Sequence, residues 1–151
     1  MPTVIFICTG NTCRSPMAAA LAASIFKQQK LNIAVLSAGV ATDDGYPASQ
    51  NAILAMEDEN IDLNPHLSTL ITQDILTQAT LVLTMTNHHL EIVKSIHPTA
   101  NAYTLSKYAG KDHDISDPYG GDLPTYRQCA AQIKELLSAS VAKLKEELCK
   151  A

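Results

Sequence analysis

The feature of this 151-residue chain that most constrains its fold is an apolar run that leads directly into a small polar loop. Val4-Ile5-Phe6-Ile7 is typical of a strand that is buried on both faces, and the loop Cys8 to Ser15 follows it without a spacer. Ser15 and Pro16 favour the start of a helix, because serine caps helix N-termini and the first helical turn tolerates proline. The segment therefore predicts a strand, a tight loop and a helix, with Cys8 where the strand ends.

The rest of the chain alternates apolar strand-like runs with longer helical patterns, which favours a parallel sheet covered on both faces. Strands are expected at 3–8, 33–37, 81–85 and 102–105. Helices are expected over 16–29, 47–60, 72–78, 87–97 and from Leu123 onward, with a loop at 106–121. We therefore expect an α/β fold in one domain, 1–151: a small doubly wound, flavodoxin-like domain whose four-stranded parallel sheet has helices on both faces.

Composition narrows the functional classes. A net charge of −4 argues against nucleic acid as a partner, because nucleic-acid binders present a basic face. No apolar run is long enough to span a membrane and no signal peptide is apparent, so we expect a cytoplasmic protein. We also expect a monomer. The four cysteines, Cys8, Cys13, Cys129 and Cys149, do not stand at metal-ligand spacings, so neither a metal nor a cofactor is expected.

The loop after the first strand combines a nucleophile with groups that bind anions. Cys8 and Arg14 are separated by five residues. Backbone N–H groups at a helix N-terminus bind anions, and a guanidinium matches two phosphate oxygens with its planar fork of donors. The same groups favour the thiolate, which is the nucleophilic form of cysteine. Gly10 and Asn11 most easily adopt the positive φ that a tight loop needs. The loop therefore predicts a cysteine-based phosphatase.

A phosphatase of this kind also needs an acid to protonate the leaving group. Asp117 is the best candidate, because the following Pro118 holds it extended and its carboxyl can project from a loop. Three nearby acids are competitors that we expect to be solvated or to cap a helix: Asp112, Asp114 and Asp122.

With these residues the chain resembles the low-molecular-weight protein tyrosine phosphatases. The resemblance rests on Cys8-Thr9-Gly10-Asn11-Thr12-Cys13-Arg14-Ser15-Pro16 and on Asp117-Pro118-Tyr119, with weaker support from Ser37-Ala38-Gly39 and the strand at 79–86. It implies that Cys8 forms a phosphocysteine intermediate, that Arg14 binds the phosphoryl oxygens and that Asp117 is the general acid and then the base. It further implies a phosphate-binding loop made of Thr9, Gly10, Asn11, Thr12, Cys13, Arg14 and Ser15.

The resemblance also assigns finer roles. Asn11 would hold the shape of the loop, Ser15 would assist the thiolate, and Cys13 would be the redox partner of Cys8 in a reversible disulfide. Thr12 is expected to determine specificity, because the protein arginine phosphatases of this family have threonine where the tyrosine-specific enzymes usually have isoleucine. Tyr119 is a second candidate for specificity. The substrates implied are phosphorylated proteins, with phosphoarginine favoured over phosphotyrosine.

Three other functions are compatible with parts of the sequence. A protein-tyrosine phosphatase would use the same mechanism, with Tyr46, Tyr108 or Tyr119 lining the entrance to the site. An arsenate reductase would need further cysteines near the middle of the chain, and residues 80 to 100 contain none. A phosphoprotein-binding module or a phosphocarrier would not need Asp117. His66, His97 and His113 are expected to be surface or loop residues without a role.

Overall fold

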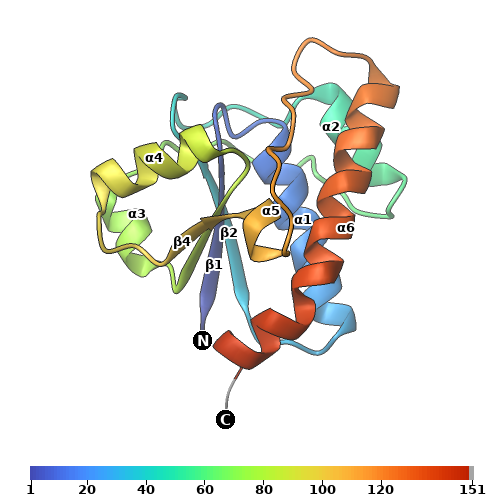
Figure 1. The fold of residues 1–151 in the computed structure, drawn as a ribbon. Helices are drawn as coiled ribbons and strands as arrows, with labels where there is room; N and C mark the ends of the chain where they lie inside the picture. Colours follow the sequence, from blue (N-terminus) through green and yellow to red (C-terminus); the bar gives the residue numbers. More distant parts are fainter. Residues whose placement is uncertain (150–151) are drawn as a thin grey trace.

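A computed structural model describes residues 1–149 of the chain, and Figure 1 shows its path. Its strands are β1 (Thr3–Cys8), β2 (Ala34–Gly39), β3 (Leu81–Thr84) and β4 (Ala102–Thr104). Its helices are α1 (Arg14–Gln28), α2 (Gln50–Glu57), α3 (Gln73–Gln78), α4 (Asn87–Ile96), α5 (Leu105–Tyr108) and α6 (Leu123–Leu148).

The four strands form one parallel sheet in the order β2-β1-β3-β4. Cys8 lies opposite Gly39 of β2, and Ile7 lies opposite Thr84 of β3, so the carboxyl ends of the three strands share one edge. The chain winds from β1 to β2 in one direction and then crosses back to β3. Ligands of doubly wound folds bind at such a reversal of strand order. The predicted fold class is confirmed, and Cys8 lies at the place where this rule puts a site.

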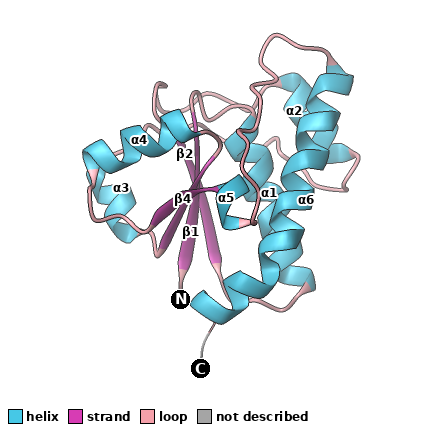
Figure 2. Cartoon of the chain, viewed as in Figure 1, coloured by secondary structure: helices cyan, strands magenta, loops and turns pink. Residues whose placement is uncertain are grey.

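Helices cover both faces of the sheet, with α1, α2, α5 and α6 on one side and α3 and α4 on the other (Figures 1 and 2). Alternation along β1 builds the two cores, because successive side chains of a strand point to opposite faces. Val4, Phe6 and Cys8 belong to the core under α1 and α6, whereas Ile5 and Ile7 pack with α3 and α4. The register of β1 therefore places the Cys8 side chain on the side of α1, the helix that follows it.

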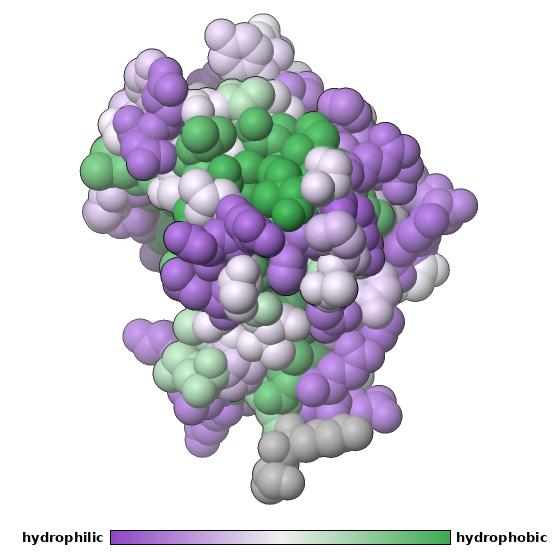
Figure 3. All heavy atoms as spheres, turned by 90° about the vertical axis from the view of Figure 1, so that its left-hand side faces the viewer, coloured by the Kyte–Doolittle hydropathy of each residue, from purple (hydrophilic) through white to green (hydrophobic). Residues whose placement is uncertain are grey.

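The face that carries α3 and α4 also exposes a group of apolar side chains (Figure 3). Val40, Ile75 and Leu90 are partly buried there against the smaller core. Along the whole of residues 1–149, no helix has both the length and the apolar character that crossing a membrane requires.

Most boundaries shift by one or two residues from the sequence prediction, and two segments differ more. The loop expected at 106–121 begins with the short helix α5, because the Thr104 side chain caps it by accepting a hydrogen bond from the backbone N–H of Lys107. The helix expected over 47–60 is shorter at both ends. Pro47 forms a β-bridge with Leu67, and the backbone N–H of Ser49 donates to the carbonyl of Thr12. The bridge pairs Pro47 with the segment between α2 and α3, and the hydrogen bond holds Ser49 against the loop that follows β1.

Candidate active site

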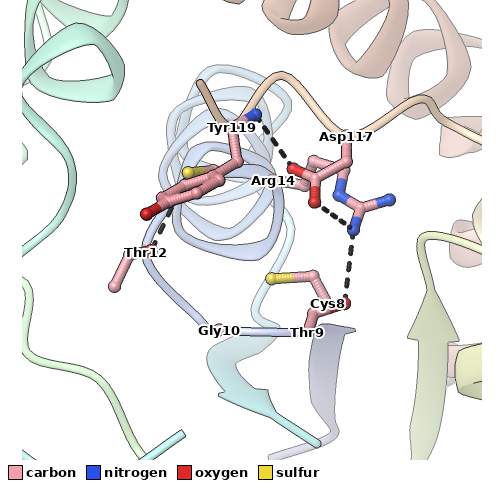
Figure 4. A pocket seen from close by; sticks show the side chains of 8 residues that line it. Cys8, Thr9, Gly10, Thr12, Arg14, Asp117 and Tyr119 are labelled. Atoms are coloured by element: carbon pink, nitrogen blue, oxygen red, sulfur yellow. Dashed lines mark hydrogen bonds and ion pairs between the residues drawn. The ribbon is translucent and has the colours of Figure 1, made fainter. Parts of the chain in front are cut away.

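A cavity of about 220 Å³ opens at the carboxyl end of β1 (Figure 4). Its lining comes from the loop after β1 and from the segment that precedes α6, which are more than 100 residues apart at Arg14 and Ile115. The lining residues are Cys8, Thr9, Gly10, Thr12, Cys13, Arg14, Asp117 and Tyr119. The structure thus brings together the predicted nucleophile, the predicted cation and the predicted acid at one cavity.

Two positions allow the loop after β1 to be tight: one has a left-handed backbone, and the other has no side chain. The positive φ expected at Gly10 is not present, and Asn11 alone in this loop adopts it. Asn11 has a φ of 54°, in the left-handed region that asparagine tolerates better than most residues. Gly39, at the end of β2, lies directly behind the loop, and a Cβ atom there would lie 2.6 Å from the carbonyl oxygen of Thr9. The absence of a side chain at Gly39 therefore lets the loop pack against the end of β2.

The Asn11 side chain ties this loop to the rest of the sheet edge. Its Nδ2 donates to Oγ of Ser15 at 2.8 Å and to Oγ of Ser37 at 3.0 Å, and its Oδ1 accepts from the backbone N–H of Thr69 at 2.9 Å. The carbonyl oxygen of Asn11 lies 2.7 Å from Nε2 of His66. His66 lies in a loop as expected, but it is not without a role, because it contacts the anion-binding loop directly.

Cys8 is buried, and its sulfur has one close polar neighbour. Oγ of Ser15 lies 2.9 Å from Sγ of Cys8. Because Ser15 already accepts a hydrogen bond from Asn11, its own hydroxyl proton is free to donate to the sulfur. A donor of this kind stabilises a thiolate. The position that was expected to assist the nucleophile therefore has the geometry to do so.

Arg14 is almost fully buried, with 4% of its surface exposed, and its terminal nitrogens have fixed partners. Nη1 donates to the carbonyl oxygen of Ile115 at 2.8 Å, and Nη2 donates to Oγ1 of Thr9 at 3.5 Å. Nη2 also lies 3.6 Å from Oδ2 of Asp117. These contacts hold the guanidinium plane at the cavity wall, where it can bind two oxygens of a phosphoryl group.

The side chain of Asp117 projects over the cavity from the segment before α6 (Figure 4). Its Oδ1 accepts a hydrogen bond from the backbone N–H of Tyr119 at 3.0 Å, and about half of the side chain is exposed. None of the three competing acids lines the cavity: Asp112 is exposed, and the other two have partners elsewhere. Asp114 accepts from the backbone N–H of Asn87, and Asp122 caps α6 by accepting from Thr125. Asp117 is the one carboxylate among the residues that line this cavity.

Cys13 also lines the cavity, but its sulfur faces a different set of neighbours. Sγ of Cys13 lies 3.3 Å from the hydroxyl of Tyr126 on α6 and 3.5 Å from Oγ of Ser49. Burial raises the pKa of Tyr126 to about 12, so its hydroxyl stays protonated. Cys8 and Cys13 are both unpaired thiols here. Cys129 is buried elsewhere on α6, where burial raises the pKa of its thiol to about 12.

His89 belongs to this site although nothing in the sequence indicated it. It lies near the start of α4 with 2% of its surface exposed, and its Nε2 is 2.9 Å from Oγ1 of Thr9. Burial, and then the positive charge of Arg14, lower the pKa of His89 to about 4. The ring is therefore neutral at physiological pH. No local pattern marks this histidine, because its partner is 80 residues away in the sequence.

A thiol, a guanidinium and a carboxylate that meet at one small cavity at a helix N-terminus define the class of cysteine-dependent phosphatases. Across residues 1–149, no group of three or more His, Cys, Asp or Glu side chains is placed to hold a metal ion. A family model described as low molecular weight phosphotyrosine protein phosphatase matches residues 3–150. The chain belongs to this family.

Several known proteins are similar to this chain in sequence and in fold. A protein-arginine-phosphatase of Bacillus subtilis is 40% identical over 147 residues, covering 95% of this chain and 97% of its own. A solved structure of the YwlE arginine phosphatase, a cysteine-to-serine mutant with a phosphorylated active-site serine, superimposes with a TM-score of 0.92 at 38% identity, covering 97% of this chain and 98% of its own. A low molecular weight protein tyrosine phosphatase of T. tengcongensis has a TM-score of 0.91 at 33% identity, covering 95% and 100%.

Proposed function

We propose that this protein is a protein-arginine phosphatase that hydrolyses phosphoarginine side chains of proteins through a phosphocysteine on Cys8. The observation that carries the proposal is the meeting of Cys8, Arg14 and Asp117 at one cavity, with the Thr12 side chain in the cavity wall. The similarity to a protein-arginine-phosphatase over nearly the whole chain supports the choice of substrate.

In the first step the Cys8 thiolate attacks the phosphorus atom. A sulfur–phosphorus bond forms and the phosphorus–nitrogen bond breaks, and the electron pair stays on the guanidine nitrogen, which takes a proton from Asp117. A bound phosphoryl group supplies Arg14 with a new anionic partner, so the carboxyl of Asp117, 3.6 Å from Nη2 in the free enzyme, is released to carry this proton. Arg14 and the loop N–H groups stabilise the charge on the transferring oxygens.

In the second step a water molecule attacks the phosphocysteine. Its proton passes to the Asp117 carboxylate, the sulfur–phosphorus bond breaks, and the electron pair returns to Cys8 as the thiolate. The Ser15 hydroxyl, 2.9 Å from the sulfur, stabilises this leaving thiolate. Inorganic phosphate then leaves, and Asp117 keeps the proton for the next cycle.

Two residues of the cavity wall support phosphoarginine as the substrate. Thr12 offers a hydroxyl where an aliphatic side chain would favour an apolar ring, and a polar, planar guanidinium suits this wall better. Tyr119 is the one aromatic side chain among the residues that line the cavity, and 78% of its surface is exposed. We infer that Tyr119 packs on the flat face of the guanidinium, as aromatic rings do with arginine.

A protein-tyrosine phosphatase is the second candidate, because the exposed ring of Tyr119 could also flank a phenyl ring at the same cavity. The mechanism would be the same, with a phenolate oxygen as the leaving atom. An arsenate reductase is less well supported, because a thiol relay needs cysteines that can reach Cys8. Cys129 instead lies buried on α6 against the carbonyl of Ser116, and Cys149 is exposed at the end of that helix.

The proposed chemistry also bears on where the protein acts. A thiolate nucleophile requires a reducing compartment, so we infer that the enzyme works in the cytoplasm. We propose that Cys13, at the same cavity, forms a reversible disulfide with Cys8 under oxidation. We propose that the protein acts as a monomer, and the net charge of −4 disfavours nucleic acid as a partner.

The test is a comparison of kcat/KM on two peptides of the same sequence, one with phosphoarginine and one with phosphotyrosine. Cys8→Ser is the blank, Thr12→Ile removes the hydroxyl from the wall, and Thr12→Ser is the matched control that keeps it. We expect the parent and Thr12→Ser to prefer phosphoarginine, and Thr12→Ile to shift toward phosphotyrosine by about 10-fold or more. A parent enzyme that prefers phosphotyrosine would refute the proposed substrate, and activity in Cys8→Ser would refute the mechanism.

A further inference from the structure

A chain of polar contacts runs from α4 into the cavity. Nε2 of the buried His89 lies 2.9 Å from Oγ1 of Thr9, and the same oxygen accepts a hydrogen bond from Nη2 of Arg14 at 3.5 Å. Thr9 also lines the cavity, directly after the nucleophile Cys8 (Figure 4). A hydroxyl between a histidine and the phosphate-binding arginine is placed to act on the bound phosphoryl group, and the mechanism above does not use it.

The inventory of donors and acceptors limits what this hydroxyl can do. A threonine hydroxyl has one proton to donate and two lone pairs that accept. The guanidinium of Arg14 can only donate, so it occupies one lone pair. What happens to the proton of Thr9 therefore depends on whether Nε2 of His89 donates or accepts.

The surroundings of His89 favour Nε2 as the donor. The ring is neutral and so carries a single N–H. Its other nitrogen, Nδ1, is buried and has no hydrogen-bond partner. If the proton were on Nδ1, a buried N–H donor would be left unpaired, and such orphaned donors are the rarer case in folded proteins. With the proton on Nε2, both lone pairs of Thr9 are occupied and its own proton is free to point into the cavity.

We propose that the Thr9 hydroxyl donates to an oxygen of the bound phosphoryl group, and that His89, donating from Nε2 to Oγ1 of Thr9, is the positioning residue that directs it. Thr9 then adds a side-chain donor to the loop N–H groups and to Arg14. Because charge builds on the phosphoryl oxygens during transfer, this donor stabilises the transition state. The inference rests on the proposed phosphatase activity of this cavity, and it does not depend on which phosphorylated residue is the substrate.

The first experiment determines which ring nitrogen of His89 carries the proton. Nitrogen-15 NMR of histidine side chains distinguishes a protonated from an unprotonated ring nitrogen, and it is recorded at neutral pH with and without inorganic phosphate. His89→Gln identifies the signals by their loss. We expect Nε2 to be protonated and Nδ1 unprotonated in both states. A proton on Nδ1 in the phosphate-bound enzyme would overturn the proposal, because the Thr9 hydroxyl would then donate its hydrogen bond to Nε2 of His89 and not to the phosphoryl group.

The second experiment measures kcat with p-nitrophenyl phosphate and the inhibition constant of inorganic phosphate. Thr9→Val should lower kcat by about 10- to 100-fold and weaken phosphate binding, whereas Thr9→Ser should recover most of the loss. His89→Leu should lower kcat by about 10-fold, and His89→Gln, whose amide nitrogen can replace the Nε2 donor, should recover part of it. His88→Leu, at the exposed neighbouring position, is the matched control and should leave both values unchanged.

The double variant separates a positioning role from a merely structural one. If His89 acts through Thr9, His89→Leu should lower kcat no further in a Thr9→Val background. An equal loss in both backgrounds, or a Thr9→Val enzyme within 2-fold of the parent, would overturn the proposal. Should His89→Leu fail to fold, the Thr9→Val and Thr9→Ser pair and the NMR experiment decide alone. A parent that hydrolyses p-nitrophenyl phosphate but not phosphoarginine would refute only the proposed substrate.

Discussion

The buried, neutral His89 makes the stability of this protein depend on pH in a definite direction. The pKa of His89 is about 4 in the folded chain and 6.5 for a free histidine, because burial and the charge of Arg14 disfavour the imidazolium. Between these two values the unfolded chain binds the proton and the folded chain does not. The free energy of unfolding therefore falls as the pH falls from about 6.5 to about 4, and it is unaffected by this group above that window.

The magnitude follows from the separation of the two pKa values, 6.5 and about 4. Each unit corresponds to about 1.4 kcal/mol, so full protonation of His89 costs about 3 kcal/mol of stability. Small domains have only about 5–15 kcal/mol in total, so this loss is large. Besides burial, the electrostatic effects on the ring come from Arg14 on α1, from His88 on the same helix, and from Asp114 and Asp117 in the segment before α6. The two aspartates partly offset the effect of Arg14, but the net direction is unchanged.

The assay is urea unfolding at a series of pH values from about 7 to about 4, comparing the parent with His89→Gln, which has no titratable ring. The parent should lose about 3 kcal/mol more than His89→Gln over this range. His88→Gln is the matched control, because His88 is exposed and its effect on the His89 pKa is smaller than those of burial and Arg14, so this variant should keep most of the parent's loss. If the parent and His89→Gln lose stability in parallel, His89 is not buried as a neutral ring and the reasoning fails.

Three further predictions concern the acid, the loop after β1 and the surroundings of Cys13. Asp117→Asn should lower kcat on a phosphoarginine peptide by about 100-fold or more, whereas Asp114→Asn should stay near the parent; equal losses would contradict the assignment of the acid. Gly39→Ala places a Cβ atom 2.6 Å from the Thr9 carbonyl, so urea unfolding should show a loss of about 1–3 kcal/mol and kcat should fall; an unchanged enzyme would mean that the loop does not need this close approach. Tyr126→Phe removes the hydroxyl that lies 3.3 Å from the sulfur of Cys13. The free energy of unfolding should fall by about 1 kcal/mol in the same assay, with little change in kcat under reducing conditions. A large loss of kcat would assign Tyr126 to catalysis instead.

The parts of the site that could be predicted from sequence are those built from consecutive residues. The structure has the buried strand and the tight loop with a positive φ at Asn11 where they were predicted. Helix α1 begins at Arg14 rather than Pro16, because the Ser15 hydroxyl lies against the sulfur of Cys8 instead of capping the helix, and Gly10 does not have the positive φ that was expected. The alternation of strands and helices likewise predicted the parallel sheet. Cys8 and Arg14 reach the same cavity because they lie at the two ends of this short loop.

The missed features depend on contacts between distant segments or on very short elements. The contact of His89 with Thr9 spans 80 residues, and nothing around either residue in the sequence predicts it. The contact of His66 with Asn11 spans 55 residues. Helix α5 has four residues, too few for a periodic pattern, and its start depends on the cap that Thr104 provides. Such features follow from tertiary packing, which a single sequence does not reveal.

The central claim is that Cys8 takes the phosphoryl group from phosphoarginine. Rapid acid quenching of the enzyme during turnover of a phosphoarginine peptide, followed by mass spectrometry of the cysteine peptides, tests it most directly. We predict phosphate on Cys8, formed and consumed at rates that account for kcat, and no phosphate on Cys13. Turnover of phosphoarginine without a phosphorylated Cys8, or with the phosphate on another residue, would contradict the account.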